Sequence, residues 1–220
     1  MYSVEGFYTR NNKLSHWEPI CEEWILLGKR YSRMTDDGEN AFGYGELPNV
    51  SMLAGAAWRC GYIALQEFAW DKNKENGRSG RADLYLCSSD YTQEYIEAKF
   101  DWLSLQSRNP KSVIEKTTRK ALNDAIKTKQ KRRHIKTVAV SFIAIYTKLT
   151  KYGEIYETLE EQINTIWQMP INGRKPDLLT WNFPEKLWQE DNRDPDTKDL
   201  TLGVLMLAQH TKETDTETEI

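Results

Sequence analysis

The sequence predicts an α/β protein in which helices flank a central mixed sheet. Segments with apolar residues at helical spacing alternate along the chain with runs of β-branched and aromatic residues typical of strands. The expected order is helix, helix, strand, strand, helix, strand, helix, strand, which fits a sheet covered by helices. No internal repeat or linker interrupts this order, so residues 1–210 are expected to form a single domain.

The first two expected elements are helices separated by a loop. Residues 17–33 place apolar side chains at helical spacing, and Pro19 stands near their start, where proline is tolerated. Residues 35–49 are rich in Gly, Asp and Asn and are expected to form a loop. Residues 51–70 are expected to form the second helix, with Ser51 as its N-cap.

Residues 81–100 are expected to form two antiparallel strands joined by a turn near Asp90. Alternate residues of a strand share a face, so one face of this pair is apolar and the other carries Asp83, Glu97 and Lys99. With the turn at Asp90, Asp83 lies opposite Glu97 or one step diagonal to it. The two carboxylates are therefore expected to be close enough to share a ligand.

The second half of the chain is expected to supply two more helices and two more strands. Residues 110–133 form a long amphipathic helix, and residues 154–167 form a further helix. The β-branched run 136–147 predicts a strand buried on both faces, and 177–183 predicts another. The acidic and polar residues 211–220 predict a flexible tail.

Composition predicts a soluble, cytoplasmic chain. Of 220 residues, 29% are charged and 39% apolar, and no apolar run approaches the ~20 residues needed to cross a membrane. The amino terminus has no hydrophobic secretion segment, and three widely spaced cysteines give neither a disulfide framework nor a zinc pattern. A dinucleotide glycine fingerprint, a P-loop and a G-x-S-x-G elbow are also absent, which argues against those enzyme classes.

Positive charge is concentrated in one stretch although the net charge is −3. Residues 108–136 contain eleven Lys or Arg against two acidic residues, about +9, so the rest of the chain carries about −12. Such an excess suits contacts to nucleic-acid phosphates, although a solvated helix flank is the alternative. The expected phosphate contacts are Lys116, Arg119 and Lys120.

The polar face of the strand pair has the residues of a metal-dependent phosphodiesterase site. Two carboxylates close together repel each other unless a cation lies between them. Mg²⁺ prefers oxygen ligands, typically one or two carboxylates, which Asp83 and Glu97 would supply beside the carbonyl of Ala98. Lys99 is placed to orient or deprotonate an attacking water, or to stabilise the charge that develops on phosphorus.

Asp83, a hairpin, the sequence Glu97-Ala98-Lys99 and a following basic helix resemble the PD-(D/E)XK nuclease superfamily. The resemblance covers about residues 51–147, with Ala82 where the name-giving proline would stand. It implies a restriction endonuclease-like fold, a mixed central sheet flanked by helices with the core order helix, three strands, helix, strand. Because only two strands are evident, the first is expected within residues 70–80.

The same resemblance implies a metal-dependent nuclease that hydrolyses DNA with Mg²⁺, or with Mn²⁺ in its place. Asp83, Glu97 and the Ala98 carbonyl would hold the metal, and Lys99 would act on the nucleophilic water. Glu67, on the expected helix 51–70, matches an acidic residue that the family often carries there and would add a direct or water-mediated ligand. A homodimer would let one site serve each DNA strand.

Several alternatives stay open. Glu97 and Lys99 would also suit a solvated cross-strand ion pair, worth about 0.2–1 kcal/mol, and Glu67 an ordinary exposed helical glutamate. The domain as a whole could be a non-catalytic, nuclease-like module that binds nucleic acid or protein. Trp102, just past Lys99, suits core packing or stacking on a base. The histidines are isolated in sequence and are expected to be structural or solvated: His16, His134 and His210.

Overall fold

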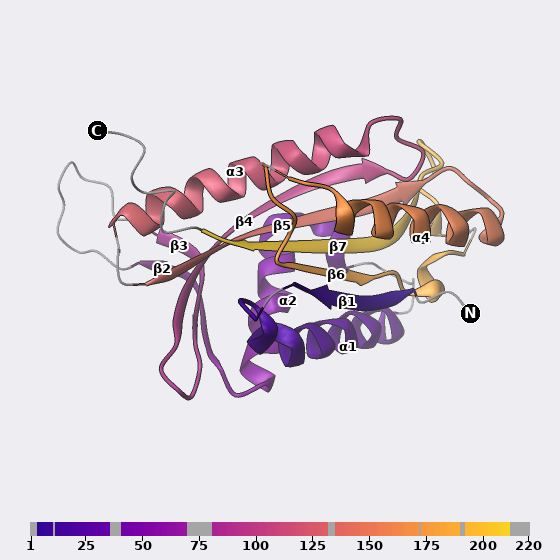
Figure 1. Ribbon diagram of the computed structural model, residues 1–220. Coiled ribbons are helices and arrows are strands. Elements are labelled where there is room, and N and C mark those ends of the chain that lie inside the picture. Colours follow the sequence, from indigo (N-terminus) through magenta and orange to yellow (C-terminus); the bar gives the residue numbers. More distant parts are fainter. Residues whose placement is uncertain are drawn as a thin grey trace.

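A seven-stranded mixed sheet runs through the computed structural model, which describes residues 4–10, 12–35, 41–69, 81–131, 135–171, 173–189 and 192–211 (Figure 1). The strand order is β1-β6-β7-β5-β4-β3-β2. Neighbouring strands run antiparallel except for β4 and β5, which are parallel. The strands are β1 (Glu5–Thr9), β2 (Ile63–Ala69), β3 (Arg81–Cys87), β4 (Gln93–Ser104), β5 (Lys136–Thr147), β6 (Leu178–Asn182) and β7 (Leu200–His210).

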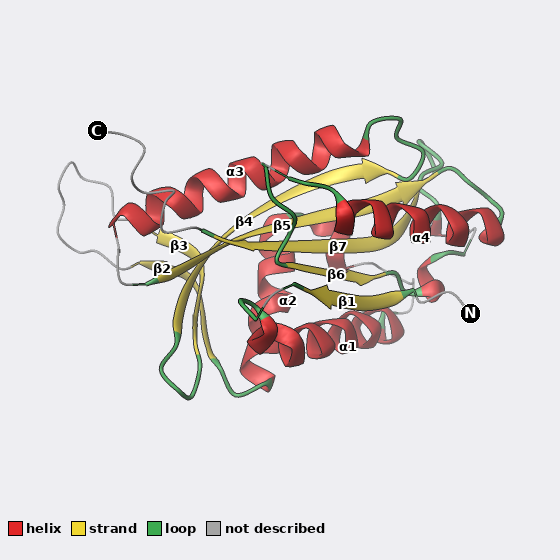
Figure 2. Ribbon diagram, viewed as in Figure 1, coloured by secondary structure: helices red, strands yellow, loops and turns green. Residues whose placement is uncertain are grey.

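Two helices cover each face of the sheet (Figure 2). One core lies between the sheet and α1 (Glu18–Met34) with α2 (Glu46–Arg59). On the other face α3 (Pro110–Lys131) and α4 (Tyr152–Gln168) pack on the strands. Three short 3₁₀ helices complete the described elements: η1 (Ser15–Trp17), η2 (Ala41–Tyr44) and η3 (Glu185–Leu187). The α/β class predicted from the sequence is confirmed.

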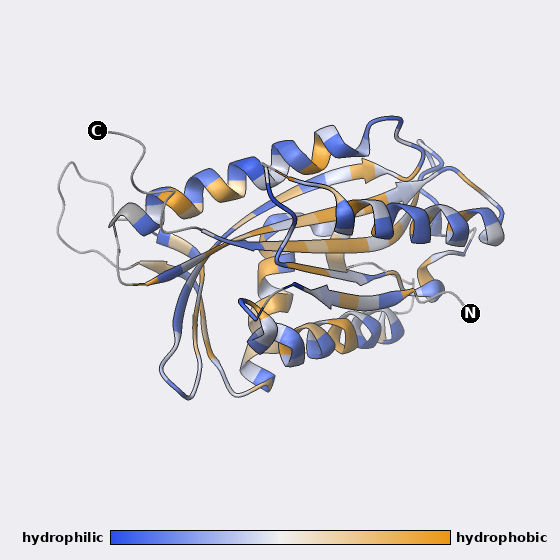
Figure 3. Ribbon diagram, viewed as in Figure 1, coloured by the Kyte–Doolittle hydropathy of each residue, from blue (hydrophilic) through white to orange (hydrophobic). Residues whose placement is uncertain are grey.

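Hydropathy follows this layering (Figure 3). The central strands are rich in hydrophobic residues, whereas each helix alternates between hydrophobic and hydrophilic positions along its length. That alternation is what an amphipathic helix with one face on a sheet requires. Within the described part of the chain, no helix combines the length and apolar character needed to cross a membrane.

Most of the predicted elements lie close to their expected bounds. The helices expected at 110–133 and 154–167 are α3 and α4, and the strand expected at 136–147 is β5. Three strands were not predicted: β1 at one sheet edge, β2 at the other edge within the expected helix 51–70, and β7 between β5 and β6. β7 is buried along nearly all its length, so its sequence is a continuous apolar run without the alternation of a half-buried strand.

The second helix differs from the prediction in both bounds. It begins at Glu46, with Gly45 rather than Ser51 as its N-cap, so the expected loop 35–49 contains η2 and the first turn of α2. It ends at Arg59, and Gly61, with a φ of 83°, turns the chain into β2. A positive φ of this kind is readily adopted by glycine and ends the helix, although the apolar spacing continues beyond it.

β2 lies in the carboxyl-terminal part of the stretch that was expected to be helical. Residues 70–80 lie outside the described residues. β2 pairs antiparallel with β3, from Ile63 opposite Cys87 to Ala69 opposite Arg81. Thr211, the first residue of the expected flexible tail, is buried, and its backbone N–H donates to the carbonyl of Thr137. The remaining residues of that expected tail, 212–220, lie outside the described ranges.

The sheet divides between β3 and β4, and this fork positions the candidate site. β3 and β4 pair only from Leu84 opposite Ile96 to Cys87 opposite Gln93. Continued by one residue, this register places Asp83 opposite Glu97, the first of the two predicted arrangements. Beyond that point β4 pairs with β5 alone, so one edge of β4 is open towards the fork.

Candidate active site

Asp83 and Glu97 lie on the face of the fork that α3 covers. Their neighbours in sequence, Ala82, Leu84, Ile96 and Ala98, are buried in the core on the opposite face, as the alternation predicts. The backbone N–H of Ala98 donates to Oδ2 of Asp83 at 2.7 Å. This bond holds the Asp83 carboxylate against β4 at the point where the two strands stop pairing.

Glu97 is fixed by α3. The Thr128 hydroxyl donates to Oε1 of Glu97 at 2.7 Å, and the Glu97 side chain is buried. Burial raises the pKa of Glu97 to about 7; the Thr128 hydrogen bond and Lys99 oppose the rise, whereas the charges of Asp83 and Asp124 add to it. Burial likewise raises the pKa of Asp83, against the Ala98 hydrogen bond and Lys99. The carboxylates of the site can therefore carry more negative charge than the single positive charge of Lys99 neutralises.

Lys99 lies at the centre of a carboxylate cluster. Its Nζ is 3.3 Å from Oδ2 of Asp124, 3.9 Å from Oδ2 of Asp83 and 4.0 Å from Oε1 of Glu46. It also donates to the Ala98 carbonyl at 2.6 Å. Burial alone would lower the pKa of Lys99, but the three carboxylates raise it above its ordinary value, so the group is an ammonium at neutral pH.

Glu46 is a member of the cluster that the sequence did not identify. It stands in the first turn of α2, and its pKa is raised first by burial and then by the charges of Asp83, Asp124 and Glu67, against Lys99. The sequence places it in a Gly-, Asp- and Asn-rich stretch that was expected to be a loop. An acidic residue directly after a glycine that caps a helix was the signal that could have found it.

Asp124 is the second unpredicted member. On α3 it shares one side with Thr117, which donates to Asp101 of β4 at 3.0 Å, and with Thr128, so this row faces β4. Asp124 also pairs with Lys127 at 3.1 Å. In sequence it looks like one of the few acidic residues in a basic helix; its spacing of seven from Thr117 and four from Thr128 is the only signal of its position.

Glu67 lies on a strand and not on the predicted helix. It interrupts β2 with a φ of 50°, is exposed, and pairs with Arg81 across the strand pair at 2.5 Å between Oε2 and Nη1. Its charge contributes weakly to the raised pKa values of Asp83 and Glu46. The structure thus places Glu67 near the site but engages its carboxylate elsewhere.

The predicted phosphate contacts are all exposed on α3. Lys116, Arg119 and Lys120 line a shallow depression on the outer side of the helix, together with Lys111 and Glu115 among others. Lys120 precedes Asp124 by one helical turn, so this basic surface adjoins the carboxylate cluster.

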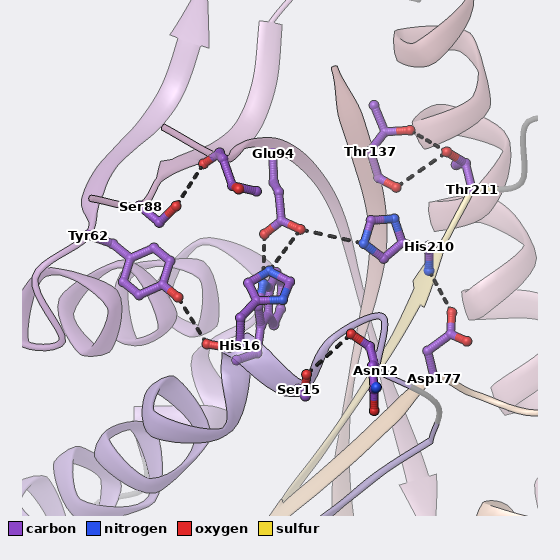
Figure 4. A network of polar contacts seen from close by, with 12 residues as sticks. Asn12, Ser15, His16, Tyr62, Ser88, Glu94, Thr137, Asp177, His210 and Thr211 are labelled. Atoms are coloured by element: carbon purple, nitrogen blue, oxygen red, sulfur yellow. Dashed lines mark hydrogen bonds and ion pairs between the residues drawn. The ribbon is translucent and has the colours of Figure 1, made fainter. Parts of the chain in front are cut away.

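A second polar cluster lies near the start of β4, on the other face of the sheet, and it joins two of the histidines that are isolated in sequence (Figure 4). Glu94 is 1% exposed, and its carboxylate meets Nε2 of His16 at 3.1 Å, Nε2 of His210 at 3.5 Å and the indole N–H of Trp17 at 2.7 Å. Burial would raise the pKa of Glu94, but these partners lower it to about 2. His134 lies outside the described residues.

The oxygen atoms at the fork have the chemistry that Mg²⁺ or Mn²⁺ requires. Asp83, Glu97 and Glu46 offer carboxylates and Ala98 a carbonyl, all hard oxygen donors. Within the described ranges, no three His, Cys, Asp or Glu side chains are already grouped as metal ligands. Metal binding would therefore require the Lys99 ammonium to give up its place between the carboxylates.

The fold and the site define an α/β protein with a seven-stranded mixed sheet and a half-buried carboxylate–lysine cluster at a strand fork. Compared with protein-family models, with curated proteins and with solved structures, the chain matches none. Any function therefore has to be inferred from this fold and this cluster.

Proposed function

We propose that the protein is a metal-dependent nuclease with a restriction endonuclease-like fold, which hydrolyses phosphodiester bonds in DNA. One observation carries the proposal: carboxylates from α2, β3 and α3 surround Lys99 of β4 where the sheet divides. Carboxylates that hold a divalent cation beside a lysine are suited to activating water and to stabilising charge on a phosphate.

The order of the core elements supports the same proposal. α2, β2, β3, β4, α3 and β5 follow one another as helix, three strands, helix and strand. This is the order implied by the resemblance of Asp83 and Glu97-Ala98-Lys99 to the PD-(D/E)XK nucleases. The acidic residue of the first helix, assigned to Glu67 from the sequence, is Glu46 in the proposal, because Glu46 lies on α2 and contacts Lys99.

Each residue of the cluster has a proposed role. Asp83 and Glu97 hold Mg²⁺ or Mn²⁺, with the Ala98 carbonyl and Glu46 as further donors. The metal supplies Lewis acidity at the phosphate and lowers the pKa of water. Lys99, held protonated by its carboxylate neighbours, orients the attacking water and neutralises charge on the phosphate oxygens. Asp124 positions Lys99 from α3.

The basic surface of α3 supplies the affinity for the substrate backbone. Lys116, Arg119 and Lys120 attract phosphates without reading sequence, and this attraction weakens as salt rises. Because they adjoin Asp124 along the helix, a bound backbone would lie beside the cluster.

A non-catalytic nuclease-like module is the second candidate, and one observation favours it. The Lys99 ammonium already satisfies three carboxylates, and no ready-made group of three metal ligands occurs in the part of the chain that is described. Such a cluster could serve as a structural ion-pair network. The two candidate functions differ in one point. In a nuclease the carboxylates release Lys99 and bind a divalent cation, whereas in a non-catalytic module they keep their contacts with Lys99.

A cleavage assay separates them. Supercoiled plasmid and labelled single- and double-stranded DNA are incubated with the protein in Mg²⁺, Mn²⁺ or EDTA, beside Lys99→Gln. The control Lys151→Gln removes a charge from an exposed pair with Glu154 at the start of α4. The proposal expects cleavage that needs metal and falls by about 10²-fold or more in Lys99→Gln. Cleavage in EDTA, or equal cleavage by Lys99→Gln, would overturn it.

A further inference from the structure

β1 is one of the two edge strands of the sheet, and its outer side has no neighbouring strand among the described elements (Figure 1). Its pairing with β6 fixes which backbone groups face outward. The Arg10 N–H donates to the Asp177 carbonyl, and the register continues from there through β1 without a break. Because every second residue of an antiparallel pair bonds to the partner strand, the N–H and C=O groups of Phe7 and Thr9 point away from β6.

The two edges of the sheet differ in how well they suit a further strand. At β2, Glu67 has a φ of 50° and interrupts the pairing with β3. An irregularity of this kind bends an edge and obstructs further pairing. β1 pairs with β6 without interruption and contains no proline. The edge at β1 is therefore the one suited to an added strand.

An apolar pocket of about 110 Å³ lies beside this edge, between β1, β6 and α4. Gly6 makes room for one of its walls: a Cβ at Gly6 would stand 2.6 Å from Cζ2 of Trp181, so the indole lies over the glycine. Val4 and Tyr8 flank Gly6 on the same face of β1 and also line the pocket. Because a cavity of about 150 Å³ holds a benzene molecule, this pocket suits one aliphatic side chain.

The surface on the α4 side of the edge is acidic. α4 contains four glutamates and neither lysine nor arginine. One of these glutamates, Glu160, is exposed and lines the pocket. The basic side chain nearby, Arg10, is engaged with α4: its guanidinium lies 4.2 Å from the ring centroid of Trp167 and donates to the Trp167 carbonyl at 3.0 Å. The Glu160 charge therefore faces solvent beside the pocket.

The α1 side of the edge also carries carboxylates. The Thr9 hydroxyl donates to Oε1 of Glu18 at 2.7 Å, and at the other end of β1 Lys29 pairs with Glu5. α1 thus runs alongside β1. Glu22 lies one turn after Glu18 on the same side of the helix and is exposed. Carboxylates therefore border the edge of β1 on both faces of the sheet.

We propose that the β1 edge binds an extended, basic segment of a partner protein as an additional strand, with one aliphatic side chain of that segment in the pocket beside Trp181. The outward backbone groups of Phe7 and Thr9 pair with the segment, the pocket selects the aliphatic residue, and Glu22 and Glu160 attract the flanking Lys or Arg. β6, β7 and β5 separate this edge from β4, so the inference does not rest on the proposed nuclease function.

A second copy of this chain fits the edge less well. An antiparallel pair of β1 strands would bring two α4 helices to the same face of one continuous sheet. Each of these helices carries four glutamates and no basic residue. Like charges placed together oppose association, whereas a basic segment is attracted.

Anisotropy of a fluorescein-labelled peptide, Lys-Lys-Val-Leu-Val-Lys-Lys, tests the inference. In an added strand its central leucine and the two lysines next but one to it share a face, so the leucine enters the pocket while the lysines lie near Glu160. Replacing the leucine by glycine leaves the charge unchanged and should raise Kd for wild type at least about tenfold, through the loss of apolar burial. A peptide with glutamate in place of every lysine should not bind.

Thr9→Pro tests the main-chain pairing. It removes an outward N–H, a position at which an edge strand tolerates proline, and should raise Kd about tenfold. Thr9→Val is the matched control: it also removes the hydroxyl bond to Glu18 but retains the N–H, and should change Kd less than twofold. Glu160→Lys should raise Kd about fivefold, whereas Glu154→Lys, at the far end of α4, should change it less than twofold.

Urea unfolding identifies the folded variants, and Glu160→Lys together with the glycine peptide keeps the test decisive if Thr9→Pro does not fold. Equal binding of the leucine and glycine peptides, an unchanged Kd in folded Thr9→Pro, or no binding by wild type overturns the inference. Sedimentation velocity provides the remaining outcome: a wild-type dimer that Thr9→Pro dissociates would assign the edge to a second copy and overturn the proposed partner. None of these results depends on whether the protein cleaves DNA.

Discussion

The Oδ2 atom of Asp124 lies 3.3 Å from the Nζ atom of Lys99, closer than the other two carboxylates that surround the lysine. This contact links α3, in the helical layer, to β4, in the sheet, at the candidate site. It also means that the protonation of Lys99 depends on the helix that carries the exposed basic residues Lys116, Arg119 and Lys120.

Asp124→Asn should change the pH dependence of cleavage. Removing a carboxylate that raises the pKa of Lys99 lets the lysine lose its proton at lower pH, so the alkaline limb of the pH–rate profile shifts to lower pH. Loss of one positioning contact should also reduce the rate about tenfold at pH 7. Glu157→Gln, the same change of charge at an exposed position of α4, serves as control. An alkaline limb that does not move in Asp124→Asn would contradict the positioning role.

Glu46 and Glu67 form a matched pair for the metal-ligand assignment. Glu46→Gln should reduce metal-dependent cleavage at least about 10²-fold and raise the metal concentration needed for half-maximal rate, because Glu46 lies in the Lys99 cluster. Glu67→Gln should change the rate less than about threefold, because its carboxylate is exposed and paired with Arg81. The reverse pattern, with Glu67→Gln inactive and Glu46→Gln active, would show that Glu67 and not Glu46 is the metal ligand.

Burial of Glu97 should make the metal-free protein less stable as pH rises. Its pKa of about 7 exceeds the ordinary 4.5, so between these values the folded state holds a proton that the unfolded chain has lost. The free energy of unfolding therefore falls with rising pH in this interval, by at most about 3 kcal/mol from this group. Urea unfolding in EDTA at pH 5 and pH 8, for wild type and Glu97→Gln, measures the difference.

In that comparison the wild type should lose stability relative to Glu97→Gln between the two pH values. An equal difference at pH 5 and pH 8 would show that Glu97 ionises with an ordinary pKa. Mg²⁺ added at pH 8 should restore part of the stability, because a cation bound by the folded state alone stabilises it.

Glu94→Gln should destabilise the fold without touching the Lys99 cluster. The buried carboxylate binds His16, His210 and Trp17, which join η1, β4 and β7 (Figure 4). Loss of its charge should cost about 3 kcal/mol in urea unfolding at pH 7. Because the folded pKa of Glu94 is about 2, its contribution is present above pH 4.5 and is lost as pH falls toward 2. The exposed Glu22→Gln is the control; similar stabilities for the two variants at pH 7 would contradict this account.

Short-range patterns predicted the parts of the site that lie on β3 and β4. The period-two alternation placed Asp83, Glu97 and Lys99 on one face, and the turn placed Asp83 opposite Glu97 or one step diagonal to it. The register of β3 and β4, continued by one residue, gives the first arrangement. These features depend on neighbours in sequence. They could be predicted because one strand face had to be apolar.

Features set by tertiary contacts could not be predicted in the same way. The apolar spacing of residues 51–70 continues through Gly61, so only the pairing of β2 with β3 shows that the helix ends before it. The sequence did not indicate Glu46, because its helix starts in a stretch with the composition of a loop. It did not indicate Asp124, because only the packing of α3 on the sheet turns this residue towards Lys99. His16 and His210 meet at Glu94 from distant parts of the chain.

The most direct test of the nuclease proposal compares Mg²⁺-dependent cleavage of labelled DNA by wild type and Asp83→Asn, purified in parallel. Asp90→Asn, the same substitution at the exposed turn between β3 and β4, is the control. The account predicts cleavage by wild type and Asp90→Asn that EDTA abolishes, and none by folded Asp83→Asn. Cleavage by Asp83→Asn at the wild-type rate, or no cleavage of any DNA by wild type with Mg²⁺ present, would contradict it.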